Sequence, residues 1–368
     1  MIDFIPIEIY TGVFYNIMLI LCLAVLLGSD APLESESNLR AKKFLGTVVL
    51  MFCLLYMGLR PINGKYFGDM RVYANTFARY AEGDAVVLEK DVYFHHFMKW
   101  ASTVMSVEMF FFVCIGLYTI PLYVFTRRVF KDYWFYGFFA LILSFSFWSF
   151  GVNGVRNGIA TSMFLMAISF QRVAYIAIGM LLAVAAHRSS LIILAAWLVT
   201  YKLRNPKLAL AGWVLAIPMS LVLGGFWEAF FLQFGFGEDE RLSSYLGGES
   251  EDTFQQTEAG SGFRWDFILY SSFGVFAGWF FIIKKKFEDN LYLRMYILYL
   301  ITNSFWILVI RANFSNRFAY LSWFILGALI IYPLLKMKFF EKQHIIVARI
   351  LFGYFMITYI LNFVLPRI

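Results

Sequence analysis

Arginines that border long apolar segments are the residues of this chain best suited to chemistry. A guanidinium presents a planar fork of donors that matches phosphate or carboxylate, and it stays charged when it is partly desolvated. Charged side chains at such depth are functional candidates, so the pattern favours a site for an anion. The alternative is that each arginine extends to water or pairs with Asp69, Glu108 or Asp266 for structural reasons. The arginines in question are Arg60, Arg156, Arg188, Arg311 and Arg317.

Short polar stretches carry these arginines together with other reactive side chains. In residues 151–162, GVNGVRNGIATS, polar residues lead into an apolar helix and place Arg156 near its N-terminal end. The backbone N–H groups and the dipole at that end favour an anion. Alternatively, Gly154 and Gly158 form a face for close helix packing, which is compatible with an anion site. The other stretches are 58–73 (GLRPINGKYFGDMRVY), 185–190 (AAHRSS), 262–272 (GFRWDFILYSS) and 311–320 (RANFSNRFAY).

The composition determines which elements must position these residues. The chain has 368 residues, of which 61% are hydrophobic and only 15% are charged. Soluble chains carry about 45–50% apolar and about 25% charged residues, and one soluble core cannot hide the excess. We therefore predict an all-α polytopic membrane protein. This class excludes a cytosolic enzyme, a secreted disulfide scaffold, a nucleic-acid-binding domain and a disordered chain.

Apolar runs between polar breaks indicate about twelve spans, because about 20 helical residues cross the hydrocarbon layer. The region 155–201 holds short pieces interrupted by polar residues, so broken or re-entrant helices are expected there. Two long polar connections, 60–106 and 225–264, join the spans, and residues 1–368 are expected to form a single transmembrane domain. The candidate spans are 9–28, 44–59, 107–126, 133–150, 155–170, 173–186, 188–201, 207–224, 265–283, 291–310, 318–335 and 345–365.

Basic residues predict the orientation of the spans. Clusters such as Arg127, Arg128 and Lys131 fall on every second connection. By the positive-inside rule that face is cytoplasmic, so both long polar connections are expected on the outer face. Most basic residues expected on the outer face are arginines rather than lysines, which adds to the case for anion recognition there.

The polar stretches and the order of the spans resemble the EpsG family of Wzy-like polysaccharide polymerases, within the wider group of O-antigen polymerases and ligases. The matching features are R…G-D…Y after the second span, N-G-x-R-N-x-I-A at a helix start, H-x-S at a break, F-R-x-D-F before a late span, and N-R-F-x-Y. Each motif is short, and together they cover most of the chain. Family members typically have Gln where this chain has Asn157.

The resemblance implies that the chain polymerises oligosaccharide repeat units carried on undecaprenyl pyrophosphate at the outer leaflet of the bacterial inner membrane. A growing glycan would leave its carrier and be transferred to a hydroxyl group of the incoming unit, within a GT-C-like membrane architecture. The implied partners are the lipid-linked oligosaccharide, the bilayer and a chain-length regulator similar to Wzz. The alternatives are an O-antigen ligase, which uses the same donor, and a flippase or transporter for the lipid-linked unit.

Such a transfer requires a grip on the pyrophosphate and a base for the acceptor hydroxyl. Arginines can hold phosphates without a metal, and the outer face offers no Asp-x-Asp tract or histidine–carboxylate cluster, so we expect metal-independent transfer and no cofactor. The candidates for the base are His187, Asp69, Glu108 and Asp266. Histidine titrates nearest to working pH, and His187 lies at a helix break beside Arg188, so it is favoured. Its alternative role is that of a satisfied structural histidine.

The predicted site divides into catalytic and binding residues. Asp69 has a structural alternative, a pair with Arg71 or Arg60. The neighbouring His95 and His96 are expected to point to different sides of one helix, at an interface rather than in the site. The expected catalytic residues are Arg156, His187, Arg317 and Asp69. The residues expected to bind the pyrophosphate or the glycan are Arg60, Arg71, Tyr73, Asn157, Arg188, Arg264, Asp266 and Arg311.

Overall fold

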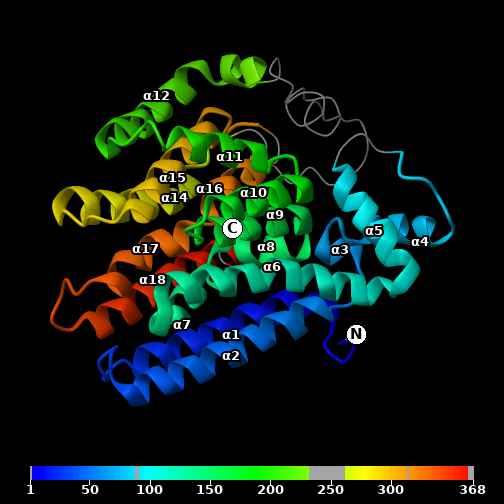
Figure 1. Ribbon diagram of the computed structural model, residues 1–368, viewed down its shortest axis with the longest axis horizontal. Coiled ribbons are helices and arrows are strands. Elements are labelled where there is room, and N and C mark those ends of the chain that lie inside the picture. The colour runs from blue at the N-terminus through cyan, green and yellow to red at the C-terminus, as the bar shows by residue number, and fades with distance from the viewer. Residues whose placement is uncertain (1, 88–90, 232–261, 313–314, 364–368) are drawn as a thin grey trace. The chain divides into compact units, whose positions relative to one another are not determined.

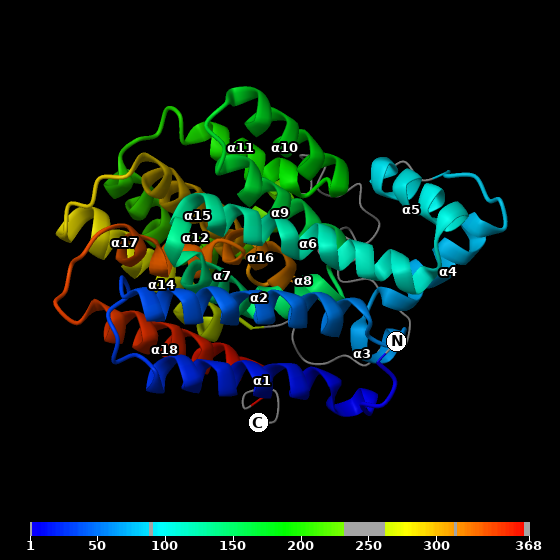
Figure 2. The ribbon, with the colours of Figure 1, turned by 60° about the horizontal axis from the view of Figure 1, so that its bottom comes forward.

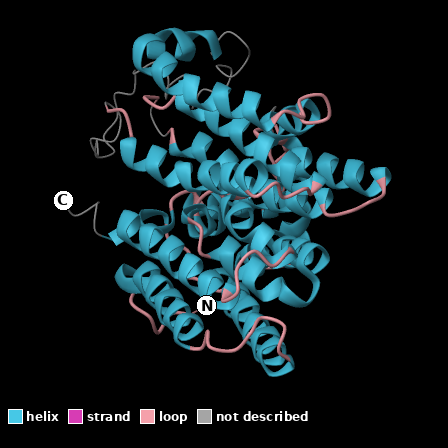
Figure 3. Cartoon of the chain, turned by 90° about the vertical axis from the view of Figure 1, so that its left-hand side faces the viewer, coloured by secondary structure: helices cyan, strands magenta, loops and turns pink. Residues whose placement is uncertain are grey.

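The computed structural model describes residues 2–87, 91–231, 262–312 and 315–363, which form helices joined by turns, with no β-strand among them (Figure 3). The prediction of an all-α chain is confirmed for this part of the sequence. The chain divides into two compact units, the first made of residues 1–191 and 331–368 and the second of residues 192–330. The single transmembrane domain over residues 1–368 and the GT-C-like architecture stay predictions.

Four long helices frame the first unit. The hydroxyl of Tyr10 donates a hydrogen bond to the carbonyl oxygen of Tyr56 (2.6 Å), and the hydroxyl of Tyr56 donates one to the carbonyl oxygen of Tyr10 (2.8 Å). This reciprocal pair joins α1 to α2 through polar groups that lipid could not satisfy. Figures 1 and 2 show α1 beside α18 and α2 beside α6. The four helices are α1 (Ile7–Leu27), α2 (Glu36–Gly58), α6 (Val107–Phe130) and α18 (Gln343–Phe363).

Short helices follow α6 along the chain. The predicted span 133–150 is interrupted at Ser144, whose backbone is extended (φ −68°, ψ 148°), because an extended residue cannot continue a helix. The breaks expected within 155–201 are confirmed, and α9 packs against both α6 and α10. These elements are η1 (Lys131–Tyr133), α7 (Trp134–Ile142), α8 (Phe145–Val152), α9 (Val155–Ile168), α10 (Val173–Ala186) and α11 (Ser190–Val199).

The connection 60–106, expected as a long polar loop, is largely helical. It contains α3 (Gly64–Phe67), α4 (Met70–Ala81) and α5 (Val92–Val104). In α4 the buried residues Tyr73, Phe77 and Tyr80 are spaced by four and three positions, so they fall on one helix face. The same spacing recurs in α5 at Phe94, Met98 and Ala101, and α4 packs against α5. Two amphipathic helices thus replace the expected loop, because their apolar faces bury each other.

The second unit contains the remaining long helices. Packing of α12 against α15 and of α15 against α14 and α16 holds it together. The predicted connection 225–264 begins inside α12, and its residues 232–261 lie outside the described residues. The helices are α12 (Pro206–Phe231), α14 (Trp265–Gly278), which continues into η3 (Trp279–Lys284), α15 (Asn290–Leu308), α16 (Asn316–Trp323) and α17 (Leu326–Lys336), whose end belongs to the first unit.

A neutral hydrogen-bond network, the Asn303 network, lies in the core of the second unit. The side chain of Asn303 accepts from Nε1 of Trp213 (2.7 Å) and donates to the hydroxyls of Ser271 (3.0 Å) and Ser322 (2.9 Å). Nε1 of Trp323 also donates to the Ser271 hydroxyl (2.8 Å). All five side chains are buried. Each buried polar group therefore has a partner on another helix, which is how polar side chains join helices in membranes.

Among the described residues, eight helices are long and apolar enough to cross a membrane, fewer than the predicted spans. The difference lies mainly in α9, α10 and α11, which have 14, 14 and 10 residues. At about 1.5 Å per residue each is shorter than the roughly 30 Å hydrocarbon layer. The chain is a multi-pass membrane protein whose shortest apolar helices do not each complete a crossing.

Candidate functional site

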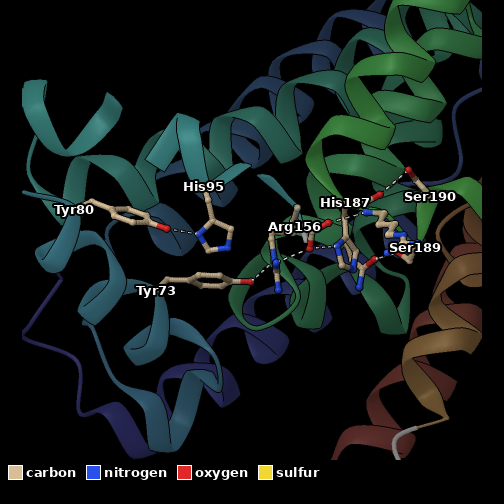
Figure 4. Close-up of polar contacts among 10 residues, drawn as sticks. Tyr73, Tyr80, His95, Arg156, His187, Ser189 and Ser190 are labelled. Carbon is tan, nitrogen blue, oxygen red and sulfur yellow. Dashed lines mark hydrogen bonds and ion pairs between the residues drawn. The ribbon is translucent and has the colours of Figure 1, made fainter. Parts of the chain in front are cut away.

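An acidic side chain, Asp91, lies at the centre of a polar cluster in the first unit. Its Oδ2 accepts a hydrogen bond from Nη1 of Arg156 (2.5 Å) and lies 2.8 Å from Nδ1 of His187. Its Oδ1 accepts the backbone N–H of Arg188 (2.9 Å). The Asp91 side chain is 6% exposed, whereas those of Arg156 and His187 are each 20% exposed. We call Asp91, Arg156, His187 and Tyr73 the Asp91 cluster; Figure 4 shows the last three together.

The backbone of Asp91 explains how its carboxylate reaches the cluster. Asp91 precedes the first residue of α5 and has a left-handed conformation (φ 49°, ψ 37°). Aspartate is one of the few residues other than glycine that adopt this conformation readily, at some cost in free energy. At this position an aspartate commonly caps the helix, but this carboxylate makes no capping bond to α5. It is committed instead to partners from α9 and from the break between α10 and α11.

Arg156 comes from the first turn of α9, where the sequence predicted it. Its Nε donates to the hydroxyl of Tyr73 on α4 (2.9 Å), and its guanidinium carbon lies 5.6 Å from the centre of the Tyr73 ring. Together with the bond to Asp91, this fixes two edges of the guanidinium. One Arg side chain therefore ties α4, the start of α5 and α9 together, in a geometry that a single ammonium group could not reproduce.

His187 lies at the corner where α10 ends and α11 is about to begin. Its backbone is extended (φ −160°, ψ 130°), and its carbonyl oxygen accepts the hydroxyl of Ser190 (2.8 Å). A carboxylate can only accept, so Nδ1 must carry the proton that is shared with Asp91. In the neutral imidazole Nε2 is then the acceptor, which is the arrangement a general base needs.

Burial and charge have opposite effects on the acid at the centre. Burial alone would raise the pKa of the Asp91 carboxyl, but the hydrogen bond and charge of His187, the charge of Arg156 and the amide of Arg188 together hold this pKa well below its usual range. Asp91 is therefore ionised at neutral pH. Burial also raises the pKa of the Tyr73 phenol, so its hydroxyl keeps its proton beside Arg156.

Two polar contacts steady the segments around the cluster. The hydroxyl of Ser189 donates to Oδ1 of Asn157 (2.6 Å), which links the α10–α11 break to α9. Oδ1 of Asn153 accepts the backbone N–H of Asp69 (3.0 Å), which links the start of α4 to the residues before α9. Gly68 is required there, because its φ is +55° and a Cβ would lie 2.2 Å from that same Asn153 oxygen.

The other predicted residues of the first unit lie in different surroundings. Arg60 is 1% exposed, donates to the carbonyl oxygens of Met57 and Val152, and packs over the rings of Phe67 and Phe111. Those two carbonyl groups lie in the last turns of α2 and α8, so Arg60 donates hydrogen bonds to carbonyl oxygens at the C-terminal ends of two helices. The side chain of Arg71 is exposed. Among the described residues, Asp69 forms no ion pair.

Four predicted residues belong to the second unit. Arg264 and Asp266 pair with each other through two bonds, Nε to Oδ1 (3.0 Å) and Nη2 to Oδ2 (2.7 Å). Arg311 is exposed and its Nη2 lies 3.4 Å from the carbonyl oxygen of Leu221. Arg317 lies in the first turn of α16 and is partly buried. The structure therefore gathers Arg156, His187 and the amide of Arg188 around Asp91, with Tyr73 bonded to Arg156. The roles of Arg264, Asp266, Arg311 and Arg317 stay predictions.

The histidines of α5 follow the predicted arrangement. His95 is buried and His96 is exposed, so they point to different sides of the helix. Nδ1 of His95 lies 3.0 Å from the hydroxyl of Tyr80 on α4 (Figure 4). Burial, helped by the charge of Arg156, lowers the pKa of His95. The His95–Tyr80 pair therefore joins α5 to α4, and burial keeps His95 neutral.

Sequence reasoning missed Asp91, the residue on which the cluster depends. It lies in the segment interpreted as a loop, 65 positions before Arg156 and 96 before His187. The available signal was local: an aspartate directly before the amphipathic pattern of α5, a typical place for a helix cap. Among the described residues, no group of three or more His, Cys, Asp or Glu side chains could hold a metal ion.

Fold and site together define a multi-pass membrane protein with a partly exposed, charged cluster between short helices of one helical unit. The model of the EpsG family matches residues 43–366, so the chain belongs to the EpsG family, a family of Wzy-like polysaccharide polymerases. No curated protein and no solved structure matches the chain. Membership of this family indicates a polysaccharide polymerase in exopolysaccharide biosynthesis.

Proposed function

We propose that this protein polymerises oligosaccharide repeat units carried on undecaprenyl pyrophosphate, by metal-independent glycosyl transfer on the periplasmic side of the bacterial inner membrane. Family membership supports the polymerase reaction. The observation that carries the choice of site is the Asp91 carboxylate, which holds an arginine and a histidine within hydrogen-bond distance of one oxygen atom. An anion-binding group and a proton acceptor side by side are what transfer from a pyrophosphate to a hydroxyl requires.

His187 is the general base in this proposal. Its Nε2 takes the proton of the acceptor hydroxyl as that oxygen attacks C1 of the donor sugar. Asp91 holds Nδ1 and so fixes the tautomer and the direction of the ring, and its charge stabilises the imidazolium that forms. Positioned bases of this kind contribute about 10²–10⁴ in rate.

Arg156 stabilises the leaving group. As the new glycosidic bond forms, the bond between C1 and the phosphate oxygen breaks, and its electron pair leaves with the pyrophosphate on the lipid carrier. Two edges of the guanidinium are held by Tyr73 and Asp91, which leaves its remaining N–H groups for phosphate oxygens. In this proposal the exposed Arg188, whose backbone amide binds the same Asp91, adds positive charge to the site. The proton on His187 then passes to solvent.

The decisive experiment uses purified protein in liposomes with a lipid-linked repeat unit. We expect polymer from the wild type, no polymer above one unit from His187→Ala, and normal chains from His96→Ala, an exposed histidine outside the cluster. Chains of normal length from His187→Ala would contradict the proposed base. EDTA should leave the rate unchanged; loss of activity in EDTA and recovery with one divalent ion would contradict the metal-independent reaction.

A deletion strain separates this function from a ligase or a flippase. Loss of a polymerase leaves single repeat units attached to the final acceptor. Loss of a ligase leaves finished polymer on the lipid carrier, and loss of a flippase leaves units on the cytoplasmic leaflet. We expect the first outcome, and either of the other two would assign the chain to the corresponding alternative.

A further inference from the structure

Helix α5 carries an exposed apolar stripe that the polymerase reaction does not explain. Tyr93, Trp100 and Val104 are 72%, 58% and 59% exposed. With the partly exposed Phe97, which stacks on Trp100, they are spaced by four, three and four positions and therefore form one stripe along the helix. Rings of this size are rarely left in water in such an array.

The stripe borders a polar one, so the surface of α5 has three sectors. The protein-facing sector is buried against neighbouring helices and contains Phe94, Met98 and Ala101. The second sector, the polar stripe, contains His96, Lys99 and Thr103, also at helical spacing. The third is the apolar stripe. A helix with one polar and one apolar sector side by side fits a boundary between water and hydrocarbon, with a long axis in the plane of that boundary.

The chain itself brings α5 to such a boundary. α5 ends at Val104, and α6 begins at Val107. Val107 is also the first residue of the apolar segment Val107–Ile142, which is long enough to cross a membrane. Met105 between them is extended, so the chain changes direction there; Figures 1 and 2 show α5 turning steeply away from the axis of α6. Two residues of separation keep the apolar stripe within reach of the lipid around the end of α6. Trp and Tyr are the side chains enriched at membrane interfaces.

We infer that α5 is an interfacial helix whose Tyr93–Phe97–Trp100–Val104 stripe inserts into the bilayer surface, with lipid as its partner. Asp91 directly precedes α5, so this anchor also sets the depth of the Asp91 carboxylate relative to the lipid headgroups. The inference concerns the membrane contact of the first unit and holds or fails independently of the polymerase reaction.

Spin labels at single cysteines in the full chain test this contact. Cys22, Cys53 and Cys114 are buried and are first replaced by Ala. Nitroxides are then placed by Trp100→Cys and Val104→Cys on the apolar stripe and by Thr103→Cys on the polar stripe, in protein reconstituted in liposomes. Relative access to oxygen and to a water-soluble nickel chelate gives the depth of each label. Tyr93→Cys provides a third apolar position in case one variant fails to fold.

We expect labels at 100 and 104 to lie about 5–10 Å below the phosphate level and the label at 103 to lie above it. Equal access to the nickel chelate at all three positions would overturn the inference, because the stripe would then face water. Low access to both reagents at 100 and 104 would overturn it as well, because a second protein surface would then cover the stripe. Neither readout depends on catalysis.

Discussion

The two polar networks of this membrane chain differ in charge and in exposure. The Asn303 network is neutral, fully buried and paired on every side by tryptophan and serine groups. The Asp91 cluster is ionised, and two of its members reach the surface. Burying a neutral amide that keeps its hydrogen-bond partners costs little free energy. Burying an ion pair commonly costs more free energy in desolvation than the attraction between its charges provides. The first network therefore suits helix packing, and the second suits a site that must act on something outside the protein.

This comparison separates stability from activity. Variants of the Asn303 network should change the free energy of unfolding and leave the rate per folded molecule intact. Variants of the Asp91 cluster should lower the rate in protein that still inserts and accumulates. Four changes probe this division, from the largest expected effect to the smallest.

Asp91→Ala should have the largest effect, a loss of polymer synthesis of at least about 10²-fold, because the base loses its orientation. It also leaves Arg156 without its carboxylate partner. The measurement is polymer formed per membrane-inserted protein. Asp84→Ala is the matched control, since that exposed acid on the same segment forms a surface ion pair with Arg79 and its loss should be nearly silent. Normal synthesis by Asp91→Ala would assign the cluster to packing.

Arg156→Lys should reduce synthesis by roughly tenfold, less than the 10²–10³ typical of a donor that is removed outright. Lysine keeps the charge but cannot reach both the Tyr73 hydroxyl and Asp91 with one ammonium group. The readout is chain length and rate in liposomes. Arg79→Lys is the control, because that arginine is exposed. Equal rates for both variants would show that synthesis does not depend on the planar fork of Arg156.

Asn303→Ala should destabilise the protein by about 1–3 kcal/mol, because the Trp213 N–H loses its acceptor and the two serine hydroxyls lose the amide in a buried core. We expect a lower midpoint of thermal unfolding in detergent with unchanged synthesis per folded molecule. Asn75→Ala, at an exposed position of α4, serves as the control. An unchanged midpoint, or a lower rate per folded molecule, would contradict the assignment of the Asn303 network to stability alone.

His95→Phe should have the smallest effect, on the pH dependence of stability. Burial lowers the pKa of His95 in the folded chain, so the unfolded chain binds more protons below about pH 6.5. The stability that depends on neutral His95 is present above that pH and is lost as pH falls below it. Midpoints of thermal unfolding are measured from about pH 7.5 down to about pH 5.5, on either side of the ordinary histidine pKa. They should fall less in the variant than in the wild type. Parallel curves would contradict this role.

The sequence predicts most helices of this chain and only part of its site. Long apolar runs such as 9–28 and 345–365 correspond to α1 and α18, because the hydropathy of a segment largely determines whether it inserts as a membrane-spanning helix. The start of α9 next to Arg156 and the break at His187 were also visible, since polar residues interrupt apolar runs there. The helices α4 and α5 were not, because their 12 and 13 residues are too few for a span and the signal lies only in the spacing of residues such as Tyr73 and Phe77.

The Asp91 cluster itself could not be derived from local patterns. Its three main members come from three separate segments, and only tertiary packing brings them together. The burial of Arg60 was equally hidden, since a sequence gives the type of a side chain but not the carbonyl oxygens of Met57 and Val152 that receive it. Tertiary structure thus places Arg60 on the carbonyl oxygens of two helix ends and brings Asp91 beside Arg156 and His187.

The shortness of α9 and α10 has a consequence for the substrate. Each has 14 residues, about 21 Å of rise, and the two are joined by a turn that contains Arg172. In the proposed orientation that turn lies at the cytoplasmic surface, so Arg156 and His187 would stand roughly 9 Å short of the opposite edge of a 30 Å hydrocarbon layer. In the proposed reaction, the diphosphate of the lipid carrier would then have to reach below that edge to be cleaved. Mobile ions screen such a recessed charge poorly, so raising the salt concentration should slow the reaction little.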